Sequence, residues 1–197
     1  MSESTNDRLK IGIILGSTRP GRNGEAVARW ALAGARERND GVDYVPIDIG
    51  EFHLPLLDEP YPPAMGRYSH AHTKAWAAAI QPLDGFVFVT PEYQHSTSAA
   101  LKNAIDYLYG EWIDKAAGFV SYGSAGGVRA VEHLRGILAE VQVATVRAQV
   151  WFSLFDDFEG MRTFRPRPEK GEQLTAMLDQ LGRWARALRT VRATARP

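Results

Sequence analysis

Apolar residues along the chain gather either in short runs or at positions spaced three and four residues apart. Short runs predict strands buried in a sheet, and the second spacing predicts amphipathic helices. The stretches that predict strands cover residues 11–15, 42–47, 85–90, 117–121 and 145–152. Helical spacing follows each of them, over residues 26–35, 70–81, 98–108, 131–141 and 172–188.

Strand and helix patterns therefore alternate along the whole chain. This order predicts an α/β fold, a three-layer sandwich in which helices cover both faces of a five-stranded parallel sheet. We expect the strand order 2-1-3-4-5, and Pro46 in the second strand suits an edge position. Ser69 and Ser98 are expected to cap the helices that follow them, and Trp184 is expected on the buried face of the last helix.

The length of 197 residues is ample for one domain with a full core and short for two. We expect residues 10–188 to form that domain, between a flexible N-terminus (1–9) and a basic flexible tail (189–197). Residues 50–67 contain four prolines and predict a long irregular loop, which either covers a ligand or partner subunit or is a plain surface excursion. Residues 155–168 are expected to form a second, mixed loop.

The charges of the chain cancel, because 23 Lys and Arg residues balance 23 Asp and Glu residues. Such a chain has no global field to attract nucleic acid or an acidic membrane, so neither is expected as a partner. The absence of cysteine excludes disulfides and thiolate catalysis. The first ten residues lack the apolar core of a signal peptide, and no apolar run reaches the roughly 18 residues that a membrane span needs. A cytoplasmic location is therefore expected.

The first loop, residues 16–24, lies between the first strand and the first helix. The unpaired amides at the start of a helix attract anions, and here Ser17, Thr18, Arg19 and Arg22 add hydroxyls and positive charge. A phosphate site is therefore the functional interpretation. A solvated turn that binds nothing is the alternative.

Two related phosphate motifs do not fit the first loop. A Walker A motif would place lysine and Ser or Thr where Arg22 and Asn23 stand. A Rossmann fingerprint would place its second glycine at Thr18, where the backbone must approach a pyrophosphate. The remaining possibility is a site for a single phosphate, which suits a mononucleotide.

Two further loops, the second (residues 91–96) and the third (122–127), follow the third and fourth predicted strands. In the expected strand order, all three loops meet at the carboxyl edge of the sheet, where such folds bind ligands. The second loop offers proline, an aromatic ring, an amide and an imidazole to a flat heterocycle. The third is rich in glycine, so its backbone can approach a ring edge closely. A phosphate site beside a slot for a flat ring indicates FMN rather than ATP.

These three loops resemble those of the NADPH-dependent FMN reductases, a family with the flavodoxin-like fold. The segments that carry the resemblance are GSTRPGRNGE, PEYQHS and SYGSAGGVRA, supported by LPLLDEPYPP, HTKAW and ALKNAIDYL, over about residues 10–152. The resemblance implies an enzyme that passes two electrons from NADPH or NADH through bound FMN to FMN, a quinone, an azo compound or a similar small acceptor. It also implies a homodimer or homotetramer in which a neighbouring subunit completes the flavin site.

The resemblance also implies which residues bind the cofactor. Those near the phosphate would be Ser17, Thr18, Arg19, Asn23, Gly24 and Glu25, with Arg22 as a neighbour. Those bordering the flavin ring would be Pro91, Glu92, Tyr93 and Gln94, and those near its far edge Ser121, Gly123 and Gly126.

One departure from the family concerns Gln94 and His95, because the family usually has asparagine followed by glycine there. The longer amide and the imidazole narrow the space over the flavin, which bears on the range of acceptors. His95 either donates a proton to a reduced quinone or neutralises an anionic acceptor, or it is simply a solvated histidine. It is the one candidate catalytic residue.

The other histidines do not predict a metal site. His70 and His72 are two residues apart, a spacing that does not share one helix face. His53 and His133 have no carboxylate or histidine at ligand spacing.

Two rival functions remain open. One is a flavodoxin-type carrier of single electrons, which the neutral charge of the chain disfavours, since such carriers are strongly acidic. The other is a non-enzymatic protein of the same fold whose aromatic surface serves assembly. Rapid reduction of bound flavin by NAD(P)H would distinguish the enzyme from both.

Overall fold

A parallel five-stranded sheet forms the centre of the computed structural model, which describes residues 8–194. The strand order is β2-β1-β3-β4-β5, as the sequence predicts. The strands are β1 (Leu9–Leu15), β2 (Val42–Asp48), β3 (Gly85–Pro91), β4 (Lys115–Gly123) and β5 (Val143–Ser153). Every residue of β3 and β4 is buried, as expected of parallel strands that are covered on both faces.

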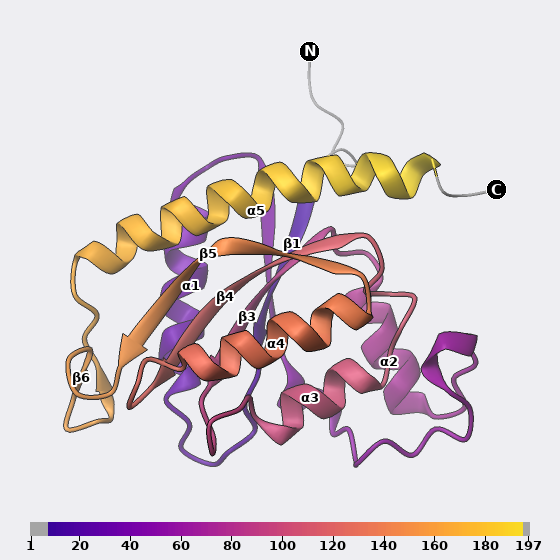
Figure 1. The fold of residues 1–197 in the computed structure, drawn as a ribbon, viewed down its shortest axis with the longest axis horizontal. Coiled ribbons are helices and arrows are strands. Elements are labelled where there is room, and N and C mark those ends of the chain that lie inside the picture. Colours follow the sequence, from indigo (N-terminus) through magenta and orange to yellow (C-terminus); the bar gives the residue numbers. More distant parts are fainter. Residues whose placement is uncertain (1–7, 195–197) are drawn as a thin grey trace.

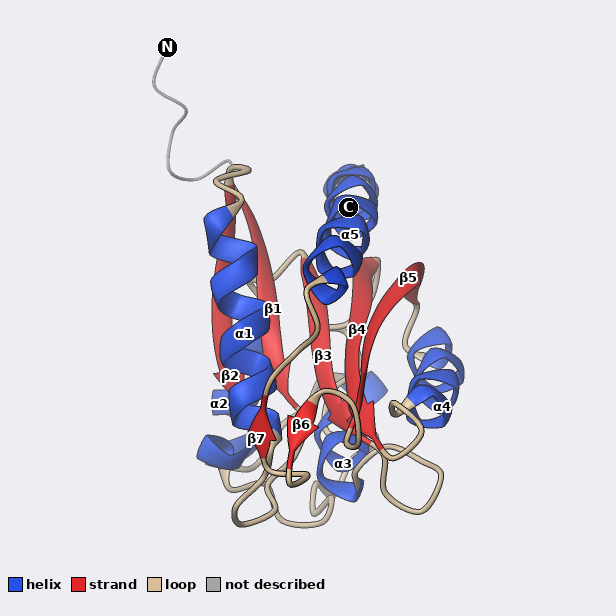
Figure 2. Cartoon of the chain, turned by 90° about the vertical axis from the view of Figure 1, so that its left-hand side faces the viewer, coloured by secondary structure: helices blue, strands red, loops and turns tan. Residues whose placement is uncertain are grey.

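Helices cover the two faces of the sheet, so the predicted α/β sandwich is confirmed (Figures 1 and 2). On one face pack α1 (Gly24–Glu37) and α5 (Glu169–Thr194), against alternate residues of β1 such as Ile11 and Ile13. On the other pack α2 (Ala71–Ile80), α3 (Ala99–Asp106) and α4 (Val128–Glu140), around Ile14 and Phe88. None of the helices within residues 8–194 is long and apolar enough to cross a membrane.

The start of one helix differs from the expectation. Ser98 caps α3 as expected, since its Oγ accepts a hydrogen bond from the Leu101 amide at 3.1 Å. Ser69 does not cap α2, whose N-cap is His70. Instead the amides of Ser69 and His70 donate to the Glu59 carboxylate at 2.7 and 3.1 Å. A residue ten positions earlier supplies the acceptor, and local sequence does not show that.

Residues 50–67 form an irregular loop with two 3₁₀ turns, η1 (Ile49–Phe52) and η2 (Pro63–Met65). The Asn103 amide of α3 fixes the loop, since it donates to the Pro55 carbonyl at 2.6 Å and accepts from the Leu57 amide at 3.0 Å. The loop nevertheless exposes large apolar side chains, and Leu56 is 82% exposed. It therefore presents an apolar surface on a hydrogen-bonded backbone.

The expected loop at 155–168 contains a small hairpin of β6 (Phe158–Glu159) and β7 (Thr163–Phe164). Phe158 and Phe164 pack with ring centroids 5.0 Å apart, and Phe164 also meets Phe152 of β5 edge-on at 4.9 Å. Strands of two residues are too short for a pattern of alternation, so the sequence did not predict them.

The end of the chain also differs from the expectation. Helix α5 continues to Thr194, so the boundary of a tail at residue 189 is wrong. Arg189 and Arg192 extend the helix because both pair with Asp84, Arg192 at 2.5 Å. Trp184 is 48% exposed rather than buried. Residues 1–7 and 195–197, the remainder of the expected flexible ends, lie outside the described residues.

Lys115, at the start of β4, is buried beneath the end of α2. Its Nζ donates to the carbonyls of Ile80 and Gln81, both at 3.0 Å. Burial, together with the positive charge of Arg192, lowers the pKa of Lys115 from 10.5 to about 7.

This low pKa predicts a stability that rises with pH. Between about pH 7 and 10.5 the unfolded chain binds the Lys115 proton and the folded chain does not, so the contribution of Lys115 to the free energy of unfolding increases through this window and is constant below it. One proton contributes at most about 1.4 kcal/mol per pH unit. Urea unfolding from pH 7 to 9.5 should show a steeper rise for the wild type than for Lys115→Met.

The matched control is Lys102→Met, because the Lys102 side chain is 44% exposed on α3. This variant should keep the wild-type dependence on pH. Parallel curves for the wild type and Lys115→Met would contradict the low pKa.

Candidate functional site

The three loops meet at the carboxyl edge of the sheet, as the sequence predicts. The Ser17 hydroxyl of the first loop lies 3.0 Å from the Tyr93 hydroxyl of the second. The Glu92 amide of the second loop donates to the Tyr122 carbonyl of the third at 3.0 Å. Hydrogen bonds thus connect all three loops.

Tyr122 occupies the centre of this arrangement. A Cβ built on Gly24 would lie 2.6 Å from the Tyr122 hydroxyl, so only glycine lets α1 begin this close to β4. Burial raises the pKa of Tyr122 above its ordinary value. Its buried hydroxyl forms no hydrogen bond within residues 8–194. The Ser17 side chain and the Gly24 backbone lie beside this hydroxyl and act against the rise in its pKa, so the first loop encloses it.

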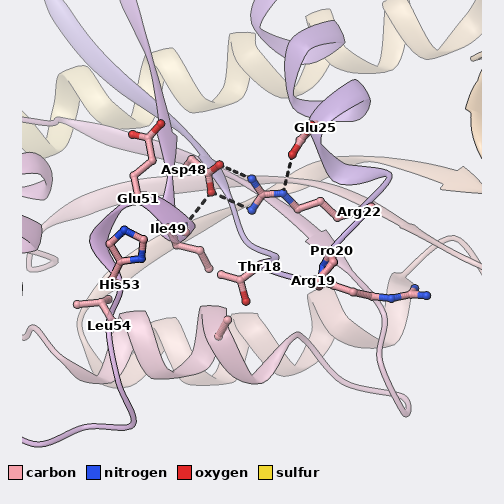
Figure 3. Close-up of a pocket in the computed structure, with 13 residues that line it drawn as sticks. Thr18, Arg19, Pro20, Arg22, Glu25, Asp48, Ile49, Glu51, His53 and Leu54 are labelled. Carbon is pink, nitrogen blue, oxygen red and sulfur yellow. Dashed lines mark hydrogen bonds and ion pairs between the residues drawn. The ribbon is translucent and has the colours of Figure 1, made fainter.

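Arg22 faces inward and fixes the first loop (Figure 3). Its guanidinium pairs with both carboxylate oxygens of Asp48 at the end of β2, donates to the Glu25 carboxylate at 3.1 Å, and also donates to the Ser17 carbonyl. Burial alone would lower its pKa, but the hydrogen bonds that it donates to Asp48 and Glu25 raise the pKa above its ordinary value. Arg22 is therefore a structural cation, and Asp48 is a residue of the site that sequence reasoning missed.

Arg19 differs from Arg22 in exposure and in the pairing of its side chain. Its side chain is exposed and extends away from Arg22 and Asp48 (Figure 3). Among the described residues, no hydrogen bond or ion pair engages its guanidinium. Arg19 is thus a cation of the first loop that an anionic ligand can engage.

The start of α1 has no side-chain cap. Asn23 is the N-cap residue, but its side chain accepts no hydrogen bond from the helix. Its amide Nδ2 instead donates to the Met161 carbonyl at 2.8 Å. The first amides of α1 are left without the usual capping oxygen, a condition that favours an anion at this end.

A cavity of about 680 Å³ opens beside the first loop (Figure 3). It is lined by residues 18–22, Glu25, residues 48–51, His53, Leu54 and Ala100. The cavity includes four predicted site residues, Thr18, Arg19, Arg22 and Glu25. The predicted residues of the second and third loops lie outside it, although hydrogen bonds connect those loops to the first.

The second loop contains a strained turn. Gln94 and His95 have positive φ angles of 48° and 65°, and Tyr93 and Ser96 exchange two backbone hydrogen bonds of 2.9 and 3.0 Å. These are the features of a type I′ turn, which favours Asn-Gly. Asn-Gly, the pair that the resemblance leads us to expect here, suits this turn, and Gln94 and His95 adopt it at a steric cost.

Two polar side chains hold the second loop to α4. The Glu92 carboxylate is buried and accepts hydrogen bonds from the Arg129 Nε at 2.6 Å and the Arg129 amide at 3.3 Å. His133 Nδ1 lies 2.9 Å from the Ser96 hydroxyl. Arg129 therefore balances the charge of Glu92, and the partner of His133 is a serine hydroxyl rather than a carboxylate or a second histidine.

The third loop is a compact glycine turn. The Ser121 hydroxyl donates to the Gly126 carbonyl at 2.7 Å, and Gly126 has a φ of 73°. A Cβ on Gly126 would lie 2.7 Å from the Trp151 ring, and one on Gly123 would lie 3.3 Å from the Gly127 nitrogen. Glycine is therefore required at position 126 by the close packing of the third loop against Trp151, and a side chain at position 123 would crowd the backbone of Gly127.

His70 and His72 lie closer together than their spacing suggested. Their rings stack with centroids 5.2 Å apart, and His72 Nε2 lies 3.0 Å from an oxygen of Asp58. They share a face because His70 is the extended N-cap residue and is not yet helical. Within residues 8–194, no group of three or more His, Cys, Asp or Glu side chains has a geometry that could hold a metal ion.

Residues 9–157 match the family model for NADPH-dependent FMN reductase. An NAD(P)H-dependent FMN reductase of Nectria sp is 42% identical over 126 residues, which cover 61% of this chain and 63% of the relative. A probable NADPH:quinone oxidoreductase of Oryza sativa subsp. japonica is 34% identical over 148 residues, covering 70% of this chain and 68% of the relative. The chain thus spans slightly less than two thirds of the first relative and slightly more than two thirds of the second.

A solved structure adds a comparison of the fold. A flavoenzyme NAD(P)H:(acceptor) oxidoreductase of Paracoccus denitrificans has a TM-score of 0.68 at 18% identity, over 89% of this chain and 98% of that one. At that identity the likeness concerns the fold alone.

The strained turn of the second loop yields a stability prediction. His95→Gly should raise the free energy of unfolding by about 1 kcal/mol, because glycine adopts a positive φ without the steric cost of a Cβ. His95→Ala removes the same imidazole but keeps a Cβ, so it should not stabilise the protein. Urea unfolding of both variants measures the difference, and equal stabilities would show that the turn is unstrained.

Proposed function

The chain belongs to the NADPH-dependent FMN reductase family, and from this membership we propose that it is an FMN-dependent NAD(P)H oxidoreductase. It takes two electrons from NADPH or NADH and passes them to FMN, a quinone, an azo compound or a similar small acceptor. The observation that carries the proposal is the convergence of the first, second and third loops at one edge of the sheet. A quinone acceptor is supported by the relationship to a plant protein of that name.

The residues of the three loops fit FMN. Arg19 and the uncapped start of α1 bind the phosphate, and Arg22 holds the loop that carries them. The buried Tyr122 side chain lies where the first and third loops meet and fixes the distance between them. The glycine turn of the third loop and the proline-led second loop border the ring. FMN, when bound, would supply the redox chemistry, since it can accept a hydride from the nicotinamide and pass the electrons to an acceptor.

The role of the second loop is to shape the space where an acceptor binds. Its turn carries exposed Gln94 and His95. We propose that His95 donates a proton to a reduced quinone or balances the charge of an anionic acceptor. The remaining predicted cofactor residues of this loop, Pro91, Glu92 and Tyr93, act through the backbone and through contacts to the first and third loops.

We also propose that the protein is a homodimer or homotetramer in which a neighbouring subunit completes the site. The support is the exposed apolar surface of residues 54–65, which includes Leu56, Tyr61 and Met65 on a backbone fixed by α3. The cytoplasmic location and the absence of nucleic acid or membrane partners stay predictions of the sequence.

Anaerobic stopped-flow spectroscopy tests the proposed activity. The FMN-loaded protein is mixed with NADPH and, separately, with NADH, and flavin absorbance is followed. We expect rapid bleaching with at least one nucleotide. Binding of FMN without reduction by either would instead favour a flavodoxin-type carrier, and no binding of FMN would overturn the assignment of the site.

The same instrument separates the two half-reactions in His95→Ala. Reduction by the nicotinamide should keep its wild-type rate, because His95 acts on the acceptor. Reoxidation by a quinone should slow by about a hundredfold, the low end of what a general acid contributes. Unchanged reoxidation with every acceptor tried would return His95 to the role of a solvated histidine.

The two arginines of the first loop give opposite predictions. Arg19→Ala should raise the dissociation constant of FMN by about tenfold, the loss of one charge-assisted hydrogen bond, with little change in melting temperature. Arg22→Ala should lower the melting temperature in the absence of FMN, because it leaves the half-buried Asp48 without its partner. Flavin fluorescence titration and thermal unfolding measure both. Unchanged FMN affinity in Arg19→Ala would overturn the phosphate assignment.

A further inference from the structure

The β6–β7 hairpin lies beyond residue 157, where the match to the family model ends, and yet it contacts the first loop. We propose that this hairpin positions the phosphate-binding end of the site. Its Met161 carbonyl orients the Asn23 amide, and Asn23 in turn presents its remaining polar groups and the open start of α1 to the anion. The inference rests on the proposed function, and it concerns the β6–β7 hairpin, which lies outside the residues that match the family model.

The central contact is the hydrogen bond from Asn23 Nδ2 to the Met161 carbonyl, 2.8 Å long between residues 138 positions apart. A carboxamide has two N–H donors and a carbonyl acceptor. One donor is used by Met161, which fixes the plane of the amide. The second donor remains for an anion, and the helix keeps its first amides uncapped.

Aromatic packing anchors the base of the hairpin. Phe158 is 4% exposed, and its ring centroid lies 6.4 Å from that of Tyr122. Phe164 meets Trp30 of α1 edge-on at 6.2 Å. The hairpin therefore packs against the end of β4 on one side and against the helix that follows the first loop on the other.

A buried carboxylate closes the base. Asp157 accepts hydrogen bonds from the Arg167 Nε at 3.0 Å and the Ser153 amide at 2.9 Å. Burial alone would raise the pKa of Asp157, but these hydrogen bonds keep it below its ordinary value. Hydrogen bonds thus connect the residue just before the hairpin to a residue just after it. The conformation of the tip is the part of the hairpin that these contacts do not fix.

The tip is strained rather than packed. Gly160 and Met161 have positive φ angles of 57° and 58°, and the Arg162 amide donates to the Glu159 carbonyl at 3.1 Å. The Met161 side chain is 53% exposed, so burial of that side chain does not explain its conformation. The two positive φ angles close the turn of the hairpin, and in this turn the Met161 carbonyl accepts the hydrogen bond from Asn23.

A pair of substitutions at Met161 tests the proposal. Met161→Pro fixes φ near −65° and destroys the turn, whereas Met161→Gly keeps both the positive φ and the carbonyl. We expect Met161→Pro to raise the FMN dissociation constant about tenfold, with kcat at saturating FMN unchanged. Met161→Gly should stay within about twofold of the wild type in both.

Two further measurements separate positioning from general support. Asn23→Ala should weaken FMN binding by itself but add nothing in the Met161→Pro background, because both changes remove one interaction. In the FMN-free protein, amides of residues 17–25 should exchange hydrogen faster in Met161→Pro than in Met161→Gly. If Met161→Pro does not fold, Gly160→Val against Gly160→Asn repeats the comparison, since asparagine tolerates positive φ and valine does not.

The proposal is overturned if the proline and glycine variants bind FMN equally, or if the effects of Asn23→Ala and Met161→Pro simply add. Failure of the wild-type protein to bind FMN would instead overturn the proposed function. The exchange measurement would then still decide whether the hairpin positions the first loop.

Discussion

The parallel pairing of β1, β3 and β4 is the constraint on which the rest of the structure depends. Leu15 pairs with Val89 and Pro91 pairs with Tyr122, so these strands end at nearly the same level. Parallel strands send their chain out at one edge, and the three loops have to meet there whatever their sequences. Their close connection through Ser17 and Tyr122 follows from this register, and glycine at position 24 permits it.

Much of this arrangement could be predicted because its signals are local. An apolar run in the sequence indicates a buried strand, and apolar residues at helical spacing indicate an amphipathic helix. Glycines between these two patterns indicate the first loop. The contributions of Arg19 and Arg22 could not be separated in the same way. Both are arginines of one loop, but Asp48 lies 26 residues from Arg22 and decides which of them stays available. The sequence therefore predicted where the candidate site lies, but it predicted the roles of the individual site residues only in part.

The errors of prediction have the same physical origin. Glu59 replaces Ser69 at the start of α2, and Asp84 holds the last turns of α5 where a tail was expected. In each case a charged side chain from elsewhere supplies a partner that local sequence does not contain. The β6–β7 hairpin escaped notice because aromatic contacts, rather than strand length, stabilise it. The type I′ turn at Gln94 and His95 was likewise hidden, since neither residue is typical of it.

The pairing of Asp84 with residues 105 and 108 positions later has a consequence for how the protein reaches its native state. Helix α5 follows all five strands of the sheet in the sequence, and Met177 and Leu181 on it cover β4 and β3. Before this helix docks, the sheet exposes one apolar face over those strands. The yield of correctly folded protein therefore depends on how fast this helix docks relative to self-association of the uncovered sheet.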